Sequence, residues 1–199
     1  MSGMKVWPIS RTNRMKPAAF LDRDGTLNIN RIGVYVTKPA EVKLYACAAR
    51  ALRLLADKGY RLIVLTNQSG VARGYMSLKR SRMINLRLKK LFMQKGARLD
   101  AVYFCPHGPE DGCSCRKPGT GLLREALKDF RTDLKGSIMI GDKASDILTA
   151  RKSGITPFLV FTGEGRAQMK KHPAALKGVR AFRDILSAAH SAADRTKSV

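Results

Sequence analysis

The sequence predicts an α/β fold in which a parallel sheet is covered by helices on both faces. Short apolar runs of strand length alternate along the chain with amphipathic segments of helix length. Polar residues follow four of the apolar runs directly, as they do where parallel strands end at one edge of a sheet. Such alternation predicts three layers joined by right-handed crossovers.

Five apolar runs have the length and composition of buried strands. They lie at residues 18–21, 61–65, 101–104, 137–140 and 158–161. The polar residues that follow four of these runs are Asp22 with Asp24, Thr66 with Asn67, Cys105 with His107, and Asp142. We expect them to converge, because ligands bind at the carboxyl ends of the strands in open α/β sheets.

Helices are expected between the strands, where apolar residues recur at helical spacing. These segments are residues 46–58, 78–94, 121–130 and 145–152, with a further helix around 179–189. Gly59 closes the first, and Ser77 caps the second. The polar segment 28–43 is predicted to form a flap over the site, with a short hairpin at 34–36.

Length and composition indicate one globular domain. The chain has 199 residues, of which 44% are hydrophobic. We place the domain at residues 18–190, between an N-terminal arm (1–17) and a C-terminal tail (191–199). No apolar run approaches the ~20 residues of a membrane span, and the first seventeen residues lack the apolar core of a secretory signal. We therefore expect a cytoplasmic protein, and a monomer.

The run Asp22-Arg23-Asp24-Gly25-Thr26 is the strongest candidate for chemistry. If the strand continues through Asp24, its period of two places both carboxylates on one side of the backbone. Two adjacent carboxylates repel each other and favour a cation, and Mg²⁺ prefers oxygen ligands together with a phosphate oxygen. Taken alone, the same residues also fit a polar turn after a strand.

A second motif holds three of the four cysteines. Cys105, His107, Cys113 and Cys115 fall within eleven residues. Three thiolates and one imidazole form a complete tetrahedral set, which favours a structural zinc ion over disulfides or reactive thiols. We expect the zinc-binding loop to position Arg116 and Lys117.

The chain is strongly basic, with 38 Lys and Arg against 15 Asp and Glu and a net charge of +23. Such a charge attracts phosphates, nucleic acids and anionic surfaces. We favour a solvated basic surface, because no helix-turn-helix, RNA-recognition signature or aromatic stacking set accompanies it. Nucleic-acid binding through the basic segment 79–95 stays open as an alternative.

Four motifs occur in one order: Asp22 to Thr26, then Thr66-Asn67, then Lys117, then Gly141-Asp142 with Asp146. In this the chain resembles the haloacid dehalogenase superfamily of phosphotransferases, over residues 18–165. The resemblance implies a Rossmann-like three-layer sandwich and a Mg²⁺-dependent phosphatase. No insert is long enough to form a large cap domain, so we expect loops to shape the pocket.

The cysteine motif followed by Arg116-Lys117-Pro118 resembles one branch, that of the heptose bisphosphate phosphatases and the histidinol-phosphate phosphatases. Residues 66–75 and 161–163 resemble the heptose enzymes, whereas the five residues between His107 and Cys113 resemble the histidinol-phosphate enzymes. A heptose bisphosphate is the favoured substrate. Histidinol phosphate is the first alternative, and a phosphorylated nucleic-acid end is the second.

The resemblance also implies a role for each matching residue. Asp22 is the expected nucleophile, and Asp24 is the expected general acid and base. Mg²⁺ is expected on Asp22, on the backbone carbonyl of Asp24 and on Asp142, with Asp146 orienting the metal shell. The residues expected to bind phosphate or substrate are Thr66, Asn67, Arg116, Lys117 and Lys143.

Overall fold

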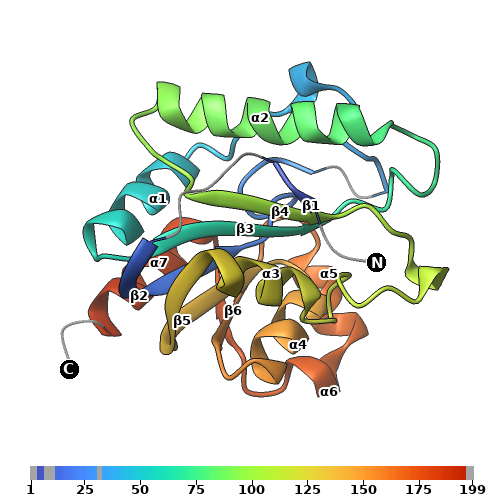
Figure 1. Ribbon diagram of the computed structural model, residues 1–199. Helices are drawn as coiled ribbons and strands as arrows, with labels where there is room; N and C mark the ends of the chain where they lie inside the picture. The colour runs from blue at the N-terminus through green and yellow to red at the C-terminus, as the bar shows by residue number, and fades with distance from the viewer. Residues whose placement is uncertain (1–3, 7–11, 31–32, 196–199) are drawn as a thin grey trace.

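The fold is built on one sheet with helices on both faces (Figure 1). The structure is a computed structural model that describes residues 4–6, 12–30 and 33–195. In these residues the sheet has seven strands, in the order β1-β4-β3-β2-β5-β6-β7. All neighbouring pairs are parallel except β1 with β4 at one edge. The strands are β1 (Met4–Lys5), β2 (Thr12–Leu21), β3 (Arg61–Asn67), β4 (Ala101–Cys105), β5 (Phe130–Gly141), β6 (Thr156–Val160) and β7 (Arg180–Phe182).

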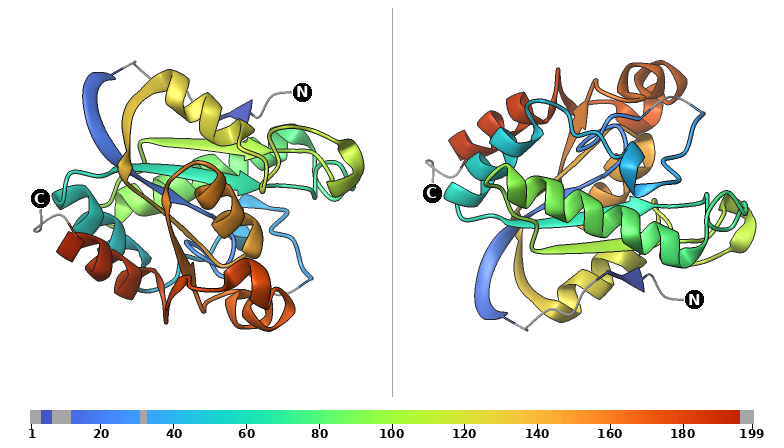
Figure 2. Two further views of the ribbon diagram at one scale, coloured as in Figure 1. Left: turned by 90° about the horizontal axis from the view of Figure 1, so that it is seen from below. Right: turned by 90° about the horizontal axis from the view of Figure 1, so that it is seen from above.

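Helices form the two outer layers, as Figure 2 shows from below and from above. The first layer holds α1 (Ala48–Asp57), α2 (Leu78–Gln94) and α7 (Ile185–Arg195). The second holds α3 (Gly121–Asp129), α4 (Ala144–Lys152), α5 (Gly165–Lys171) and α6 (Pro173–Leu176). Two short 3₁₀ helices, η1 (Pro39–Glu41) and η2 (Pro109–Asp111), lie in connecting loops. The predicted three-layer α/β arrangement is confirmed.

Alternation along β2 explains the two layers. Ala19 and Leu21 pack into the core beneath α1, α2 and α7, whereas Ala18 and Phe20 pack into the core on the α3 side. All four side chains are fully buried, since β2 lies between β3 and β5 in the centre of the sheet. A strand buried on both faces needs a continuous apolar run, which is what the sequence shows at 18–21.

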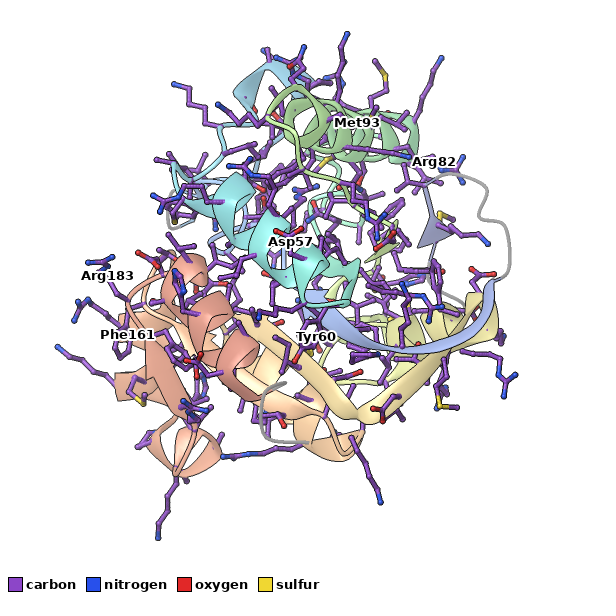
Figure 3. All side chains as sticks on the ribbon, turned by 90° about the vertical axis from the view of Figure 1, so that its left-hand side faces the viewer. Asp57, Tyr60, Arg82, Met93, Phe161 and Arg183 are labelled. Atoms are coloured by element: carbon purple, nitrogen blue, oxygen red, sulfur yellow. The ribbon has the colours of Figure 1, made fainter. Side chains whose placement is uncertain are left out.

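Helix α2 begins and ends where the sequence predicts. The Ser77 hydroxyl accepts a hydrogen bond from the Arg80 backbone N–H, which satisfies one free donor of the first turn. Ile84, Leu88 and Phe92 are buried, and the opposite face is exposed. Seen from the side in Figure 3, Arg82 and Met93 lie on α2 in the outer layer.

Several elements differ from the prediction. Strand β2 begins at Thr12 and β5 at Phe130, so both extend well before their apolar runs. The segment expected to be helical from residue 179 starts with β7, and α7 begins only at Ile185 and continues to Arg195. The hairpin expected at 34–36 is absent from the described residues, where this segment has no strand. The starts of β2 and β5 carry charged residues and β7 is a short edge strand, so these segments give little apolar signal; at 34–36 a β-branched run forms no strand because it pairs with no other strand of the described residues.

The described residues contain no helix with the length and apolar character needed to span a membrane. The loops that follow β2, β3, β4 and β5 lie at one edge of the sheet, together with the loop that carries η2 (Figure 2). This edge is where the polar residues predicted from the sequence come together.

Candidate active site

One cavity of about 450 Å³ opens at the carboxyl edge of the sheet. Its lining includes all seven residues predicted to be catalytic or to bind phosphate and substrate: Asp22, Asp24, Thr66, Asn67, Arg116, Lys117 and Lys143. They come from the ends of β2, β3 and β5 and from the segment after the cysteine motif. The convergence predicted from the strand order is therefore present for these residues, and Asp142 lies close to Asp22, whereas Cys105 and His107 belong to a separate cluster.

Lys117 lies at the bottom of this cavity, with only 3% of its surface exposed. Its ammonium group contacts Asp22 Oδ1 at 2.7 Å and Asp146 Oδ1 at 2.6 Å, and it donates to the Leu65 carbonyl. Burial alone would lower the pKa of Lys117, but the two carboxylates raise it. The side chain is thus a fixed positive charge beside the predicted nucleophile.

Asp22 forms a compact group with two other buried carboxylates, Asp142 and Asp146. Oxygen atoms of Asp22, Asp142 and Asp146 lie within 4.8 Å of one another. Burial, followed by the charges of Asp22 and Asp146, raises the pKa of Asp142. Burial is also the main reason that the pKa of Asp146 rises to about 6.

This group fits a hard divalent cation. Asp142 Oδ1 is buried and has no hydrogen-bond partner, although Oδ2 accepts a bond from the Glu164 backbone N–H at 2.8 Å. A cation would supply the missing partner and would offset the repulsion among three carboxylates. The side chain of Asp146 belongs to this group and that of Asp24 does not. Ligation through the Asp24 backbone carbonyl stays a prediction.

Two glycines allow Asp142 to sit where it does. A Cβ atom on Gly25 or on Gly163 would clash with the Asp142 carboxylate. Both have positive φ angles, +85° and +58°, which also favour glycine. The glycine after Asp24 therefore provides room for a carboxylate from β5 as well as a turn.

The carboxylate of Asp24 is held by a separate network. Arg23 donates to both of its oxygens, from Nε at 3.1 Å and from Nη2 at 2.7 Å. Asn28 donates to Oδ1 and Gln68 donates to Oδ2, each at 2.9 Å. Burial would raise the pKa of Asp24, but the charge of Arg23 and these hydrogen bonds together lower it.

The other predicted phosphate ligands have specific partners. Thr66 Oγ1 accepts a bond from Gln68 Nε2. The Asn67 amide pairs with the Lys117 backbone, accepting from its N–H and donating to its carbonyl, both at 3.0 Å. Arg116 donates to the His107 carbonyl, and Lys143 pairs with Glu164 at 2.8 Å. Asn67 thus fixes the backbone of Lys117 in this structure.

The cysteine motif folds into a compact ligand set. The Sγ atoms of Cys105, Cys113 and Cys115 are 3.2 to 3.6 Å apart. His107 Nδ1 lies 3.2 Å from the Sγ of Cys115 and 3.5 Å from that of Cys105. A tetrahedral zinc ion with Zn–S bonds of about 2.3 Å separates its sulfur ligands by about 3.8 Å. These sulfur separations exceed the length of a disulfide bond, about 2.05 Å, and fit ligands around a zinc ion better.

Some residues of the site were not singled out from the sequence. Gln68, Asn28 and Asn85 belong to the network around Arg23 and Asp24. Arg73, Tyr35 and Tyr75 line the cavity, and the two tyrosine rings lie 5.2 Å apart. Gln68 and Arg73 could have been noted because they follow β3 directly in the sequence. Arg23, which is buried in the structure, stands between Asp22 and Asp24, and this position next to two carboxylates was a signal for an ion pair.

Known proteins resemble this chain in sequence and in fold. A family model described as HAD-hydrolase-like matches residues 114–188. A protein of Thermoplasma acidophilum, named as a probable D-glycero-D-manno-heptose-1,7-bisphosphate 7-phosphatase, is 44% identical over 76% of this chain and 94% of its own. The D-glycero-β-D-manno-heptose-1,7-bisphosphate 7-phosphatase of Haemophilus ducreyi is 42% identical over 75% of this chain and 85% of its own.

A solved structure of a protein with a similar name also resembles this chain in fold. The D,D-heptose 1,7-bisphosphate phosphatase of Bordetella bronchiseptica, crystallised with magnesium and phosphate, superposes with a TM-score of 0.83. It is 32% identical to this chain, and the match covers 90% of this chain and 99% of that one. From the fold, the convergent site and these relatives, the chain belongs to the haloacid dehalogenase-like phosphatases.

Proposed function

We propose that this phosphatase depends on Mg²⁺ and removes the 7-phosphate of D-glycero-D-manno-heptose 1,7-bisphosphate through an aspartyl-phosphate. The observation that carries the mechanism is the buried cluster of Asp22, Lys117, Asp142 and Asp146 at the bottom of the cavity. The names of the relatives support the choice of substrate.

In the first step a carboxylate oxygen of Asp22 attacks phosphorus. The bond between phosphorus and the sugar oxygen breaks, and that oxygen keeps the electron pair and takes a proton from Asp24. The negative charges of the bound phosphate favour the protonated form of Asp24 at this stage. Lys117 stays beside Asp22 and stabilises the charge that develops on the phosphoryl oxygens.

In the second step the Asp24 carboxylate removes a proton from water as its oxygen attacks phosphorus. The bond between phosphorus and the Asp22 oxygen breaks, which restores the Asp22 carboxylate and releases inorganic phosphate. The Arg23 charge that lowers the pKa of Asp24 favours the ionised form that this step requires.

A divalent cation held by Asp22, Asp142 and Asp146 would supply the positive charge that lets an anionic nucleophile meet an anionic phosphate. Thr66, Arg116 and Lys143 also line the cavity and would hold phosphate oxygens of the substrate. Two separate cationic side chains, Arg116 and Lys143, suit a substrate with two phosphates.

The proposal includes a structural zinc ion on Cys105, His107, Cys113 and Cys115. The close contacts among these four side chains support it. Its ligands must stay reduced, which suits a cytoplasmic location. We also propose that the protein acts as a monomer, since every residue of the proposed mechanism belongs to one chain.

The test is phosphate release in the presence of Mg²⁺, with heptose 1,7-bisphosphate and histidinol phosphate compared at equal concentrations. A kcat/KM at least about tenfold higher for the bisphosphate supports the proposal. A preference for histidinol phosphate would reassign the substrate, in line with the short spacing between His107 and Cys113. If neither compound is hydrolysed, the next substrates are nucleic acids with phosphorylated ends, which the net charge of +23 would attract.

A further inference from the structure

We propose that Arg23 and Asn85 are positioning residues that hold Asp24 for proton transfer and keep its carboxylate away from the metal-binding group. The inference rests on the proposed function, in which Asp24 is the general acid and base. It adds a link between the catalytic edge of the sheet and the buried face of helix α2.

Arg23 is almost completely buried, with 1% of its surface exposed. A buried guanidinium is costly unless its donors are satisfied. Besides its two bonds to Asp24, it donates from Nη1 to Asn85 Oδ1 at 2.8 Å and from Nη2 to Gln68 Oε1 at 2.9 Å. The guanidinium is therefore held by Asn85 on helix α2 and by Gln68 in the segment after β3.

Asn85 is a polar residue on the buried face of α2, next to Ile84 and one turn from Leu88. Its surface is fully buried, and its Nδ2 atom has no hydrogen-bond partner among the described residues. The bond from Arg23 to its Oδ1 is thus the interaction that explains a buried amide at this position. The Asn85 amide oxygen therefore serves to orient the Arg23 guanidinium.

The network fixes both oxygens of Asp24. Oδ1 accepts bonds from Arg23 and Asn28, and Oδ2 accepts bonds from Arg23 and Gln68. A carboxylate with two donors on each oxygen cannot rotate without breaking several charge-assisted hydrogen bonds. Such bonds are shorter and stronger than neutral ones, so the orientation is well defined.

This geometry explains why two aspartates two residues apart take different roles. Asp22 joins Asp142 and Asp146 in the group that fits a cation. Asp24 is excluded from that group because Arg23 holds its side chain. Without this restraint, a nearby divalent cation would compete for the Asp24 carboxylate and remove it from proton transfer.

The test uses two substrates that differ in their need for a general acid. A sugar phosphate has a poor leaving group that needs protonation, whereas p-nitrophenyl phosphate releases a stable anion. The value of kcat/KM reports the steps through departure of the alcohol, so it isolates the acid role from the later attack of water. Variant Asp24→Asn defines the pattern for loss of the acid, with a large fall only for the sugar phosphate.

Variant Asn85→Leu keeps the branched shape of the side chain, with two methyl groups in place of the amide oxygen and nitrogen, and removes the acceptor for Arg23. We expect kcat/KM for heptose 1,7-bisphosphate to fall by about tenfold or more, while kcat/KM for p-nitrophenyl phosphate changes by less than about threefold. The matched control is Ser81→Ala, also fully buried on α2, which should leave both values unchanged. Should Asn85→Leu not fold, Asn85→Ala carries the same comparison without added bulk.

Equal losses on both substrates would overturn the inference, because a purely structural role affects both. Unchanged values for both would overturn it as well. The wild-type enzyme tests the proposed function separately: if it hydrolyses neither phosphate ester, that function fails, and the inference about Asp24 fails with it. If it hydrolyses only histidinol phosphate and the aryl ester, the substrate is reassigned and histidinol phosphate replaces the heptose in the comparison.

Discussion

Lys117 contacts Asp22 at 2.7 Å although the two residues are 95 positions apart in the chain. The contact joins the segment after the cysteine motif to the end of the central strand β2. The Asn67 amide secures the backbone of Lys117 from the end of β3. The proposed nucleophile and its neighbouring charge are thus brought together by three separate parts of the sequence.

Replacing Asp22 by Asn should abolish turnover and preserve the fold. The amide is nearly isosteric but is a far weaker nucleophile, so we expect phosphate release to fall by at least about 1,000-fold. Phosphate release and thermal unfolding are measured on the same preparations. Asp57→Asn, a change at an exposed aspartate on α1, is the control and should behave as wild type. Substantial activity in Asp22→Asn would refute the nucleophile assignment.

Removing the charge of Lys117 should destabilise the protein as well as inactivate it. Lys117→Met leaves Asp22 and Asp146 buried without their cation, and breaking a buried pair of this kind costs about 3–5 kcal/mol. Denaturant unfolding measures the loss, and Mg²⁺ should reduce it, because a bound cation restores positive charge beside the carboxylates.

The control for Lys117 is Lys128→Met on α3, whose ion pair with Glu125 is largely exposed. It should change the free energy of unfolding by less than about 0.5 kcal/mol. If the two variants lose similar stability, the buried pair contributes no more than a surface one.

Adding one methyl group at Gly163 should weaken metal binding. In Gly163→Ala the new Cβ clashes with the Asp142 carboxylate and with the Cα atom of Gly25, so the carboxylate and the turn that follows Asp24 must shift. Gly154→Ala is a matched control, because its φ of +66° is similar and its Cβ would meet no atom within 4 Å. Both should lose about 1 kcal/mol from the positive φ. Gly163→Ala alone should require a higher Mg²⁺ concentration for half-maximal activity; an equal requirement in both variants would show that Asp142 does not hold the metal.

Loss of one thiol should release zinc and disturb the cavity. Cys115 is buried and contacts three other members of its ligand set. Metal analysis should find about one zinc per chain in the wild type and in Cys47→Ser, and much less in Cys115→Ser. Activity should fall in Cys115→Ser, because Arg116 and Lys117 follow directly in the chain. Wild-type protein prepared without added metal that contains far less than one zinc per chain would contradict the assignment.

The strands that run through the core could be predicted because both their faces are apolar, as at residues 18–21 and 101–104. The first halves of β2 and β5 could not be predicted, because residues such as Lys16 and Lys135 interrupt the apolar pattern of a buried strand. The pairing of Thr12 with Phe130 and of Lys16 with Thr132 shows that these halves support each other. Such pairing is a tertiary interaction that no local pattern contains.

The convergence of the candidate site residues could be predicted more closely than the bounds of the elements that carry them. Asp22, Thr66 and Asp142 each follow an apolar strand, so strand order alone brings them together. Two contacts of the site could not be predicted, because they depend on side-chain orientation. These are the hydrogen bond between Asn67 and the Lys117 backbone and the ion pair between Arg23 and the Asp24 carboxylate. The approach of Asp146 to Asp22 depends in the same way on the angle of helix α4.

The position of β2 between β3 and β5 has a consequence for synthesis on the ribosome. Domains are made from the N-terminus, so β2, β3 and β4 emerge before residue 106, with Asp22 already at its strand end. One edge of β2 stays unpaired until β5 emerges, and the same late segment delivers Asp142 and then Asp146. A nascent chain therefore has the proposed nucleophile early but gains the carboxylates that complete the candidate metal site only when the second half of the sheet has docked.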